Sequence, residues 1–352
     1  MNEKEFISFE SDYNNGAHPA VLRCLVETNP RPSASYGDDC WSRAAREKIA
    51  RACDSERADV FFLVGGTQTN AVVISALLAP YEGVVAVDTA HINVHESGAI
   101  EGTGHKVLAL PGHNGLMDPD ELASLLEAFH ADPNRDHMVW PGMVYVTFPT
   151  ELGTLYTRER LERIHATCRR YSIPLYIDGA RLGYGLMASD CDFDLPWLAR
   201  HCDAFYIGGT KMGALCGEAV VFPQGNAPAH FFTHVKRQGA LLAKSRVVGV
   251  QFDALFTDGL YFDIARHALD MAARLRRLFV ERGYEVTPST TNQQFVLLTP
   301  EQVEHIARHV AFELWERVPG DARNRDLYRF VTSWATTQAH LDALAAALDT
   351  MP

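Results

Sequence analysis

A lysine lies shortly after an apolar run near the middle of the chain. Lysines are uncommon in this position relative to a buried strand. The run at residues 204–207 ends in Gly208-Gly209-Thr210, and Lys211 comes next. Lysine side chains normally lie on solvated faces, so an amine directly after a buried strand is unusual. Such an amine can act as a nucleophile and form a Schiff base with a carbonyl group. Taken alone, this motif is explained more often by an ordinary surface lysine than by a Schiff-base lysine. The other motifs of the chain are needed to choose between the two.

An aspartate closes another apolar run upstream, in Ile177-Asp178-Gly179-Ala180-Arg181. It precedes Lys211 by about thirty residues, the separation that one intervening helix requires. A carboxylate in a partly dry place needs a cationic partner, because burying it alone is costly. The protonated ring nitrogen of a cofactor and Arg181 are both candidates, and this motif alone does not choose between them.

A third motif, Val64-Gly65-Gly66-Thr67-Gln68, leads from an apolar run into an apolar helical pattern. Glycines let backbone N–H groups approach an anion, Thr67 can cap the helix, and a helix N-terminus favours negative charge. A phosphate fits this place. A structural tight turn is an equally good explanation, and a nucleotide loop is a poorer one because the GxGxxG and GxxxxGK[ST] patterns are absent.

Histidines lie in the segment that follows the apolar run ending at Val87. His91 can stack on a flat cofactor and take part in proton transfer. A histidine held by ordinary loop hydrogen bonds explains it equally well. His95 has the same two explanations, and for His95 the structural one is favoured.

The elements that must position these residues form a repeating pattern. Seven short apolar runs alternate with helical patterns, at residues 60–64, 84–87, 106–110, 143–146, 174–177, 204–207 and 219–222. Continuous apolar strands between helices predict a mostly parallel sheet covered on both faces, with its active site at the carboxyl ends of the strands. Each motif above falls at such an end.

The pattern changes after residue 252 and predicts a second, smaller unit. A long amphipathic helix carries one apolar stripe, and a strand (294–298), a helix from about 301, a strand (327–334) and a last helix (339–348) follow. We expect three parts: a segment at 1–29 that packs on the small domain, a large domain at 30–252, and an α+β domain at 253–352.

Composition narrows the class of protein. The 352 residues are 47% hydrophobic and carry a net charge of -12, which argues against nucleic acid or an anionic membrane as a partner. No apolar run has the roughly 20 residues of a membrane span, and the N-terminus is unlike a signal peptide, so we expect a cytoplasmic protein. The seven cysteines lack metal-ligand spacing, and we predict no metal site.

The chain resembles the L-threonine aldolase and β-eliminating lyase family of pyridoxal-phosphate (PLP) enzymes over nearly its whole length. The resembling segments are Ser11-Asp12, Tyr36-Gly37-Asp38-Asp39, Gly66-Thr67-Gln68, His91, Asp178-Gly179-Ala180-Arg181, Thr210-Lys211, Arg237-Gln238 and Arg329-Phe330-Val331-Thr332. The resemblance implies the aspartate-aminotransferase fold (fold type I). In this fold, a three-layer α/β/α large domain with a mostly parallel seven-stranded sheet carries a small α+β C-terminal domain.

The same resemblance implies roles in binding PLP. Lys211, next to Thr210, would carry the cofactor as a Schiff base, and Asp178 would pair with the ring nitrogen. His91 would stack on the ring, and the family's phosphate-binding positions fall on Gly66 and Thr67.

Other family positions concern the substrate and the assembly. Ser11, Arg181 and Arg329 match carboxylate-binding positions, where guanidinium groups suit an amino-acid carboxylate. Arg237 matches a position that reaches the phosphate of a neighbouring subunit, which implies a homodimer or homotetramer with sites at the subunit interface. His137 lies beside Met138, the position that aligns by counting with a second catalytic histidine.

Two departures from the family pattern surround the substrate. Residues 148–154 replace the family's usual acid-asparagine-threonine run, and His95 stands where an aromatic residue is usual. They leave the PLP prediction unchanged and weaken the case for threonine as the substrate.

The leading hypothesis is cleavage of an L-3-hydroxy-α-amino acid, such as L-threonine or L-allo-threonine, into glycine and an aldehyde. β-Elimination or transamination on the same scaffold is the alternative among enzymes. A binding or regulatory protein that keeps the fold without turnover is a third hypothesis, because fold alone does not guarantee activity.

Overall fold

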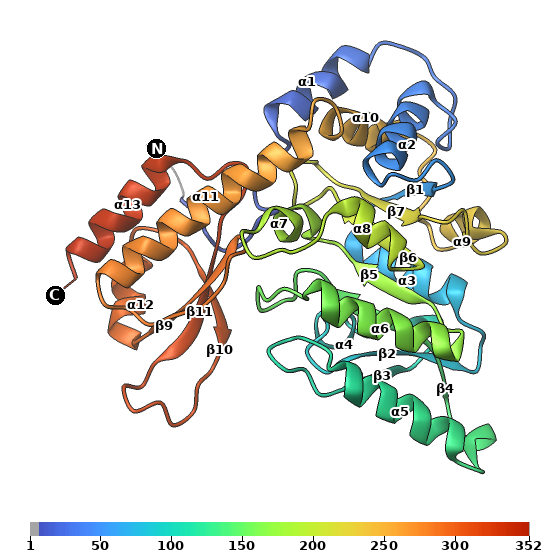
Figure 1. The fold of residues 1–352 in the computed structure, drawn as a ribbon. Coiled ribbons are helices and arrows are strands. Elements are labelled where there is room, and N and C mark those ends of the chain that lie inside the picture. The colour runs from blue at the N-terminus through green and yellow to red at the C-terminus, as the bar shows by residue number, and fades with distance from the viewer. Residues whose placement is uncertain (1–6, 352) are drawn as a thin grey trace.

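The computed structural model describes residues 7–351, and its centre is a seven-stranded sheet (Figure 1). All seven predicted strands are present, as β1 (Asp59–Leu63), β2 (Glu82–Val87), β3 (Val107–Leu110), β4 (Trp140–Thr147), β5 (Leu175–Asp178), β6 (Ala204–Gly208) and β7 (Glu218–Phe222). The order across the sheet is β1-β7-β6-β5-β4-β2-β3, and only β7 runs antiparallel to its neighbours. The predicted mostly parallel sheet is therefore confirmed.

The central strands are continuous apolar runs because helices cover the sheet. Every residue of β5, β6 and β7 is buried. Several helices begin at side-chain caps, such as Asp118, which accepts hydrogen bonds from the N–H groups of Asp120 and Glu121. The helices of this region are α2 (Cys40–Ala52), α3 (Gly66–Leu77), α4 (His91–Val94), α5 (Pro119–Ala131), α6 (Arg158–Tyr171), α7 (Leu182–Met187), α8 (Leu195–Arg200), α9 (Phe231–Arg237) and α10 (Arg246–Leu255), with 3-10 turns η1 (Glu101–Thr103) and η2 (Arg135–His137).

A smaller antiparallel sheet lies toward the C-terminus, with strand order β10-β11-β9-β8. Its strands are β8 (Val286–Thr287), β9 (Gln293–Leu298), β10 (Glu313–Glu316) and β11 (Asp326–Val331). Helices α11 (Leu260–Glu281), α12 (Pro300–Ile306) and α13 (Gln338–Asp349) accompany it. A separate apolar cluster that includes Leu275, Phe279 and Phe330 forms its core.

The N-terminal segment contacts both parts of the molecule. Phe9 joins the small sheet, since its N–H donates to Ala311 O and its carbonyl oxygen accepts from Val331 N–H. Helix α1 (Pro19–Thr28) instead packs against α10 of the larger part, with Val21 buried. The predicted packing of segment 1–29 on the small domain thus describes the residues around Phe9 but not α1, and residues 1–6 lie outside the described residues. None of the helices in residues 7–351 is long and apolar enough to span a membrane.

Candidate active site

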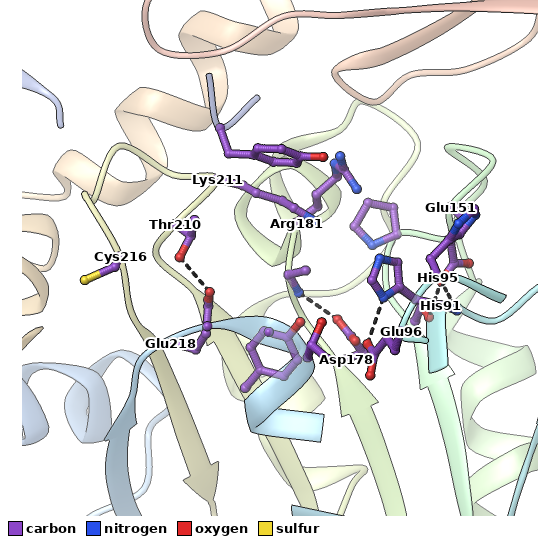
Figure 2. Close-up of a pocket in the computed structure, with 18 of the residues that line it drawn as sticks. His91, His95, Glu96, Glu151, Asp178, Arg181, Thr210, Lys211, Cys216 and Glu218 are labelled. Atoms are coloured by element: carbon purple, nitrogen blue, oxygen red, sulfur yellow. Dashed lines mark hydrogen bonds and ion pairs between the residues drawn. The ribbon is translucent and has the colours of Figure 1, made fainter. Parts of the chain in front are cut away.

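A cavity of about 530 Å³ opens where strands β4, β5 and β6 end (Figure 2). Thr147 ends β4, Asp178 ends β5, and Lys211 follows β6; all three line the cavity. Eight of the eleven residues predicted to form the site line it: Gly66, Thr67, His91, Asp178, Arg181, Thr210, Lys211 and Arg329.

Glycines bring the loops after β5 and β6 into contact. A Cβ atom on Gly179 would lie 2.0 Å from Tyr206 O, and one on Gly208 would lie 2.2 Å from Ala180 O. No side chain larger than hydrogen fits at these distances, so both positions require glycine. This close approach places Asp178 and Lys211 on adjacent loops at one end of the sheet.

The Lys211 side chain is half-buried, and its amine lies among charges of both signs. Burial and the Arg181 guanidinium lower the pKa of Lys211 to about 8, while the carboxylates of Asp12, Asp178 and Glu218 oppose the shift. Lys211 Nζ lies 5.7 Å from the centre of the Tyr13 ring. An amine with this pKa is partly neutral near pH 8, which a nucleophilic amine requires.

Asp178 is held by three neutral donors. Its Oδ2 accepts hydrogen bonds from Tyr145 Oη (2.6 Å) and Asn70 Nδ2 (2.9 Å), and its Oδ1 accepts one from Ala180 N–H (3.0 Å). Burial and Asp178 raise the pKa of Tyr145, so the phenol remains a donor. Within residues 7–351 no lysine, arginine or histidine forms an ion pair with Asp178, which is 2% exposed. The cationic partner that such a carboxylate needs can therefore come from a bound molecule.

Arg181, the other candidate partner of Asp178, binds Asp12 instead. Arg181 Nε and Nη2 donate to the two carboxylate oxygens of Asp12 at 2.8 and 3.0 Å, and both side chains are buried. Burial opposes ionisation of Asp12, but the guanidinium prevails and lowers the pKa of its carboxyl. Two of the five N–H donors of Arg181 are thus used by Asp12, which leaves the two on Nη1 and the second on Nη2 for a substrate carboxylate.

Arg329 reaches the cavity from β11. It donates to Gln293 Oε1 (3.1 Å) and pairs with Glu313 on β10, and its guanidinium carbon lies 4.6 Å from the centre of the Trp315 ring. Arg329 Nε is buried and without a hydrogen-bond partner in the described part of the chain. A bound carboxylate could satisfy this donor.

Helix α3 begins at the cavity wall, in the Gly65-Gly66-Thr67 segment. Its N-cap, Gly65, has no side chain to cap the helix, and the first turn contains no acidic residue. The first N–H groups of this twelve-residue helix therefore remain for an anion, which the helix dipole also favours. This arrangement suits the predicted phosphate site.

His91 is connected to Asp178 through two side chains. His91 Nδ1 lies 2.8 Å from Glu96 Oε1, Asn70 Nδ2 donates to the same Glu96 oxygen (2.8 Å), and Asn70 also donates to Asp178. Since the Glu96 carboxylate accepts hydrogen bonds, it favours the tautomer with a proton on Nδ1 and leaves Nε2 as an acceptor. Figure 2 shows His91, Glu96 and Asp178 on one side of the cavity.

Thr210 contacts another buried acid that the sequence analysis did not identify. Its hydroxyl donates to Glu218 Oε1 (2.7 Å), and Gly209 N–H donates to Glu218 Oε2 (3.0 Å). Burial raises the pKa of Glu218 to about 7. These bonds fix the turn that carries Lys211.

The other three predicted site residues do not line the cavity. Ser11 is buried and its hydroxyl accepts a hydrogen bond from Tyr13 N–H. Arg237 is exposed at the end of α9. His137 is exposed in η2, before β4 begins at Trp140, whereas the cavity lies at the other end of β4. Eight strand residues at ~3.3 Å each place His137 roughly 25 Å away, so within its own chain the geometry argues against the predicted catalytic role.

Several cavity residues were missed because nothing in their local pattern marks them. Glu151 follows β4 within the run at 148–154, which the sequence analysis noted only as a departure from the family pattern. Glu313 and Trp315 lie on the edge strand β10, which has no apolar run to predict it. His95 was considered, and it lines the cavity at 5.6 Å from His91 between ring centres.

Comparison with known sequences finds a family and similar enzymes. The family described as β-eliminating lyase matches residues 11–311. The low specificity L-threonine aldolase of a Pseudomonas species is 30% identical over 344 residues, with 96% of both chains covered. Its namesake in Pseudomonas aeruginosa is 29% identical over 344 residues and covers 96% of this chain and 95% of its own.

Solved structures give the same fold. The threonine aldolase of Leishmania major superposes with a TM-score of 0.93 at 35% identity and covers 97% of this chain and 98% of its own. An aspartate aminotransferase of Thermus thermophilus superposes with a TM-score of 0.68 at 15% identity, over 98% of this chain and 96% of its own. The predicted aspartate-aminotransferase fold is confirmed.

Proposed function

Because the chain belongs to the β-eliminating lyase family, we propose that it is a PLP-dependent aldolase. It cleaves the Cα–Cβ bond of an L-3-hydroxy-α-amino acid and releases glycine and an aldehyde. Two relatives of similar length are named low specificity L-threonine aldolases, and a structure with a TM-score of 0.93 is a threonine aldolase, which supports this reaction.

The cavity residues fit PLP. Lys211 would hold the aldehyde carbon covalently, the α3 N-terminus with Gly66 and Thr67 would hold the phosphate, and Asp178 would pair with the ring nitrogen. The observation that carries the proposal is the pair Asp178 and Lys211 in one cavity. Asp178 is a buried acid without a cationic partner in residues 7–351, and Lys211 is a half-buried amine with a lowered pKa. When bound, PLP withdraws the electrons released at Cα into its ring.

The chain's own groups would orient the substrate. Arg329 and Arg181 line the cavity and would bind the α-carboxylate through their remaining N–H donors. Holding the carboxylate would determine which bond at Cα is broken. Asp178 would keep a proton on the ring nitrogen, because a protonated nitrogen pairs with the carboxylate. His91, held by Glu96, would cover one face of the ring.

A product assay tests the reaction. We expect glycine and the matching aldehyde from L-threonine, L-allo-threonine or L-phenylserine with the PLP-loaded protein, and none from Lys211→Ala. β-Elimination is the second candidate, because the family is described by that chemistry. Pyruvate from L-serine, with no glycine from any of the hydroxy amino acids, would reject the aldolase proposal in favour of elimination.

We also propose a cytoplasmic homodimer or homotetramer in which Arg237 completes the phosphate site of a neighbouring subunit. The exposure of Arg237 at the end of α9 supports this role. Mixed assemblies test it: Lys211→Ala and Arg237→Ala chains, each impaired alone, should regain activity when refolded together. In a mixed dimer, one of the two sites combines Lys211 of the Arg237→Ala chain with Arg237 of the Lys211→Ala chain, so both residues of that site are native. If mixing restores no activity, Arg237 does not act across an interface.

A further inference from the structure

Glu151 is a buried acid on the cavity wall to which no role has been assigned above. It follows β4, beside His91 in Figure 2, and only 6% of its surface is exposed. Its Oε1 accepts hydrogen bonds from His91 N–H (2.9 Å) and from Thr147 Oγ1 (2.8 Å). These two bonds fix the direction of the carboxyl group.

The second oxygen, Oε2, is buried and has no hydrogen-bond partner in the described residues. A buried carboxylate oxygen left unpaired costs free energy, so it indicates a partner that binds later. Asp178 and Glu218, two other acids of the cavity, have partners for both oxygens. Glu96 also has one unpaired oxygen, but its other oxygen is bound to the His91 imidazole.

Electrostatics favours Glu151 as a proton acceptor. Burial raises its pKa, and the nearby Asp178 carboxylate raises it further, whereas the hydrogen bonds from Thr147 and His91 N–H oppose the shift. A carboxylate whose pKa is raised toward neutrality is a stronger base than an exposed one. No lysine or arginine of residues 7–351 forms an ion pair with Glu151 that would fix it as an inert anion.

We propose that Glu151 is the catalytic base that takes the β-hydroxyl proton of the substrate, an inference that rests on the aldolase function. The hydroxyl proton moves to Oε2, the Cβ–O bond becomes the carbonyl of the aldehyde, and the Cα–Cβ bond breaks. The electron pair of that bond is released at Cα, which then takes a proton from water to give glycine. Glu151 releases its proton to water and is ready for the next substrate.

Other candidates fit this step less well. His137 lies outside the cavity. His95 is exposed and, among the described residues, has no hydrogen bond that would fix its ring. His91 is held through Nδ1 by Glu96, and in the proposed function its ring would cover one face of the cofactor. Glu96 shares the burial, the fixed direction and the unpaired oxygen, but its carboxylate is bound to the His91 imidazole. Among the described residues of the cavity, this leaves Glu151 as the acid that fits the step best.

The variant Glu151→Gln tests the role, because the amide oxygen can still accept from His91 N–H and Thr147. We expect kcat for cleavage of L-phenylserine to fall ~10²–10⁴-fold, the usual contribution of a general base. The visible absorbance of bound PLP and the exchange of the α-hydrogen of glycine in heavy water should stay at wild-type level, because glycine has no β-hydroxyl. Glu127→Gln, an exposed glutamate on α5, is the matched control and should cleave normally.

Glu151→Ala with added formate gives an independent test if the glutamine variant folds poorly. Formate should restore cleavage in this variant and leave glycine exchange unchanged, because a small carboxylate can occupy the vacated space. Cleavage by Glu151→Gln within about threefold of wild type would overturn the proposal, as would loss of cleavage and glycine exchange together without rescue by formate. If the wild-type protein exchanges glycine but cleaves no hydroxy amino acid, the aldolase function itself fails, and the role of Glu151 fails with it.

Discussion

The variant Asp12→Asn tests whether the buried ion pair between Asp12 and Arg181 organises the cavity. Asp12 accepts two hydrogen bonds from Arg181 and one from Asn292, and both members of the ion pair are buried. The substitution keeps the shape of the side chain and removes its charge. Arg181 is then left as a buried cation without its counterion.

The expected loss of stability is large. Removing one partner of a buried ion pair costs about 3–5 kcal/mol, because the other charge stays desolvated. The entropy of unfolding is ~2.1 cal/mol/K for each of the 352 residues, so this loss corresponds to a fall in Tm of roughly 4–7 °C. The apoprotein is the right material, because bound PLP would add its own stabilisation.

A second effect should appear at Lys211. Arg181 lowers the pKa of Lys211 and Asp12 raises it, so Asp12→Asn should move this pKa below about 8. The measurement is the pH dependence of the rate at which the apoprotein forms its Schiff base with PLP. A general loss of packing would not shift this profile to lower pH.

The exposed pair Arg200 and Asp54 provides the control. Its members lie 3.5 Å apart, and exposed pairs contribute only about 0–1 kcal/mol, so Asp54→Asn should leave Tm and the Lys211 profile nearly unchanged. If Asp12→Asn behaved like Asp54→Asn in both measurements, the Asp12 and Arg181 pair would not organise the cavity, and the argument above would be refuted.

Three further predictions concern single residues. Schiff-base formation by the wild-type apoprotein should accelerate as pH rises through about 8, because only the neutral Lys211 amine reacts; a flat profile would contradict the lowered pKa. His137→Ala should retain wild-type kcat and KM for L-phenylserine, since the residue lies outside the cavity. A tenfold fall in kcat would show that His137 takes part in catalysis. The pKa of Glu218 is raised from 4.5 to about 7, so its stabilising contribution is present below pH 4.5 and lost as pH rises through 7. Glu218→Gln should therefore flatten the fall in apoprotein Tm across this range, and an unchanged fall measured by thermal denaturation would exclude Glu218 as its cause.

The sequence predicted the large sheet well because each central strand carries its own signal. A run such as 204–207 is apolar throughout because both faces of β6 are covered, and the glycine that follows permits the turn to Lys211. The small sheet was predicted only in part. Strand β10 is polar and half-solvated at a sheet edge, so it left no pattern, although it brings Glu313 and Trp315 to the cavity.

Some residues of the site could also be predicted from the sequence and others could not. The difference is whether the features that mark a residue are close to it in the sequence. Lys211 and Asp178 could be predicted because strand, glycine and charge are adjacent in the sequence. The pairing of Arg181 with Asp12 could not, because the two are 169 positions apart and only the fold brings them together. Glu151 is similar: its role depends on an oxygen left unpaired between β4 and α4, which is a property of the packed cavity and not of the residues around it in the chain.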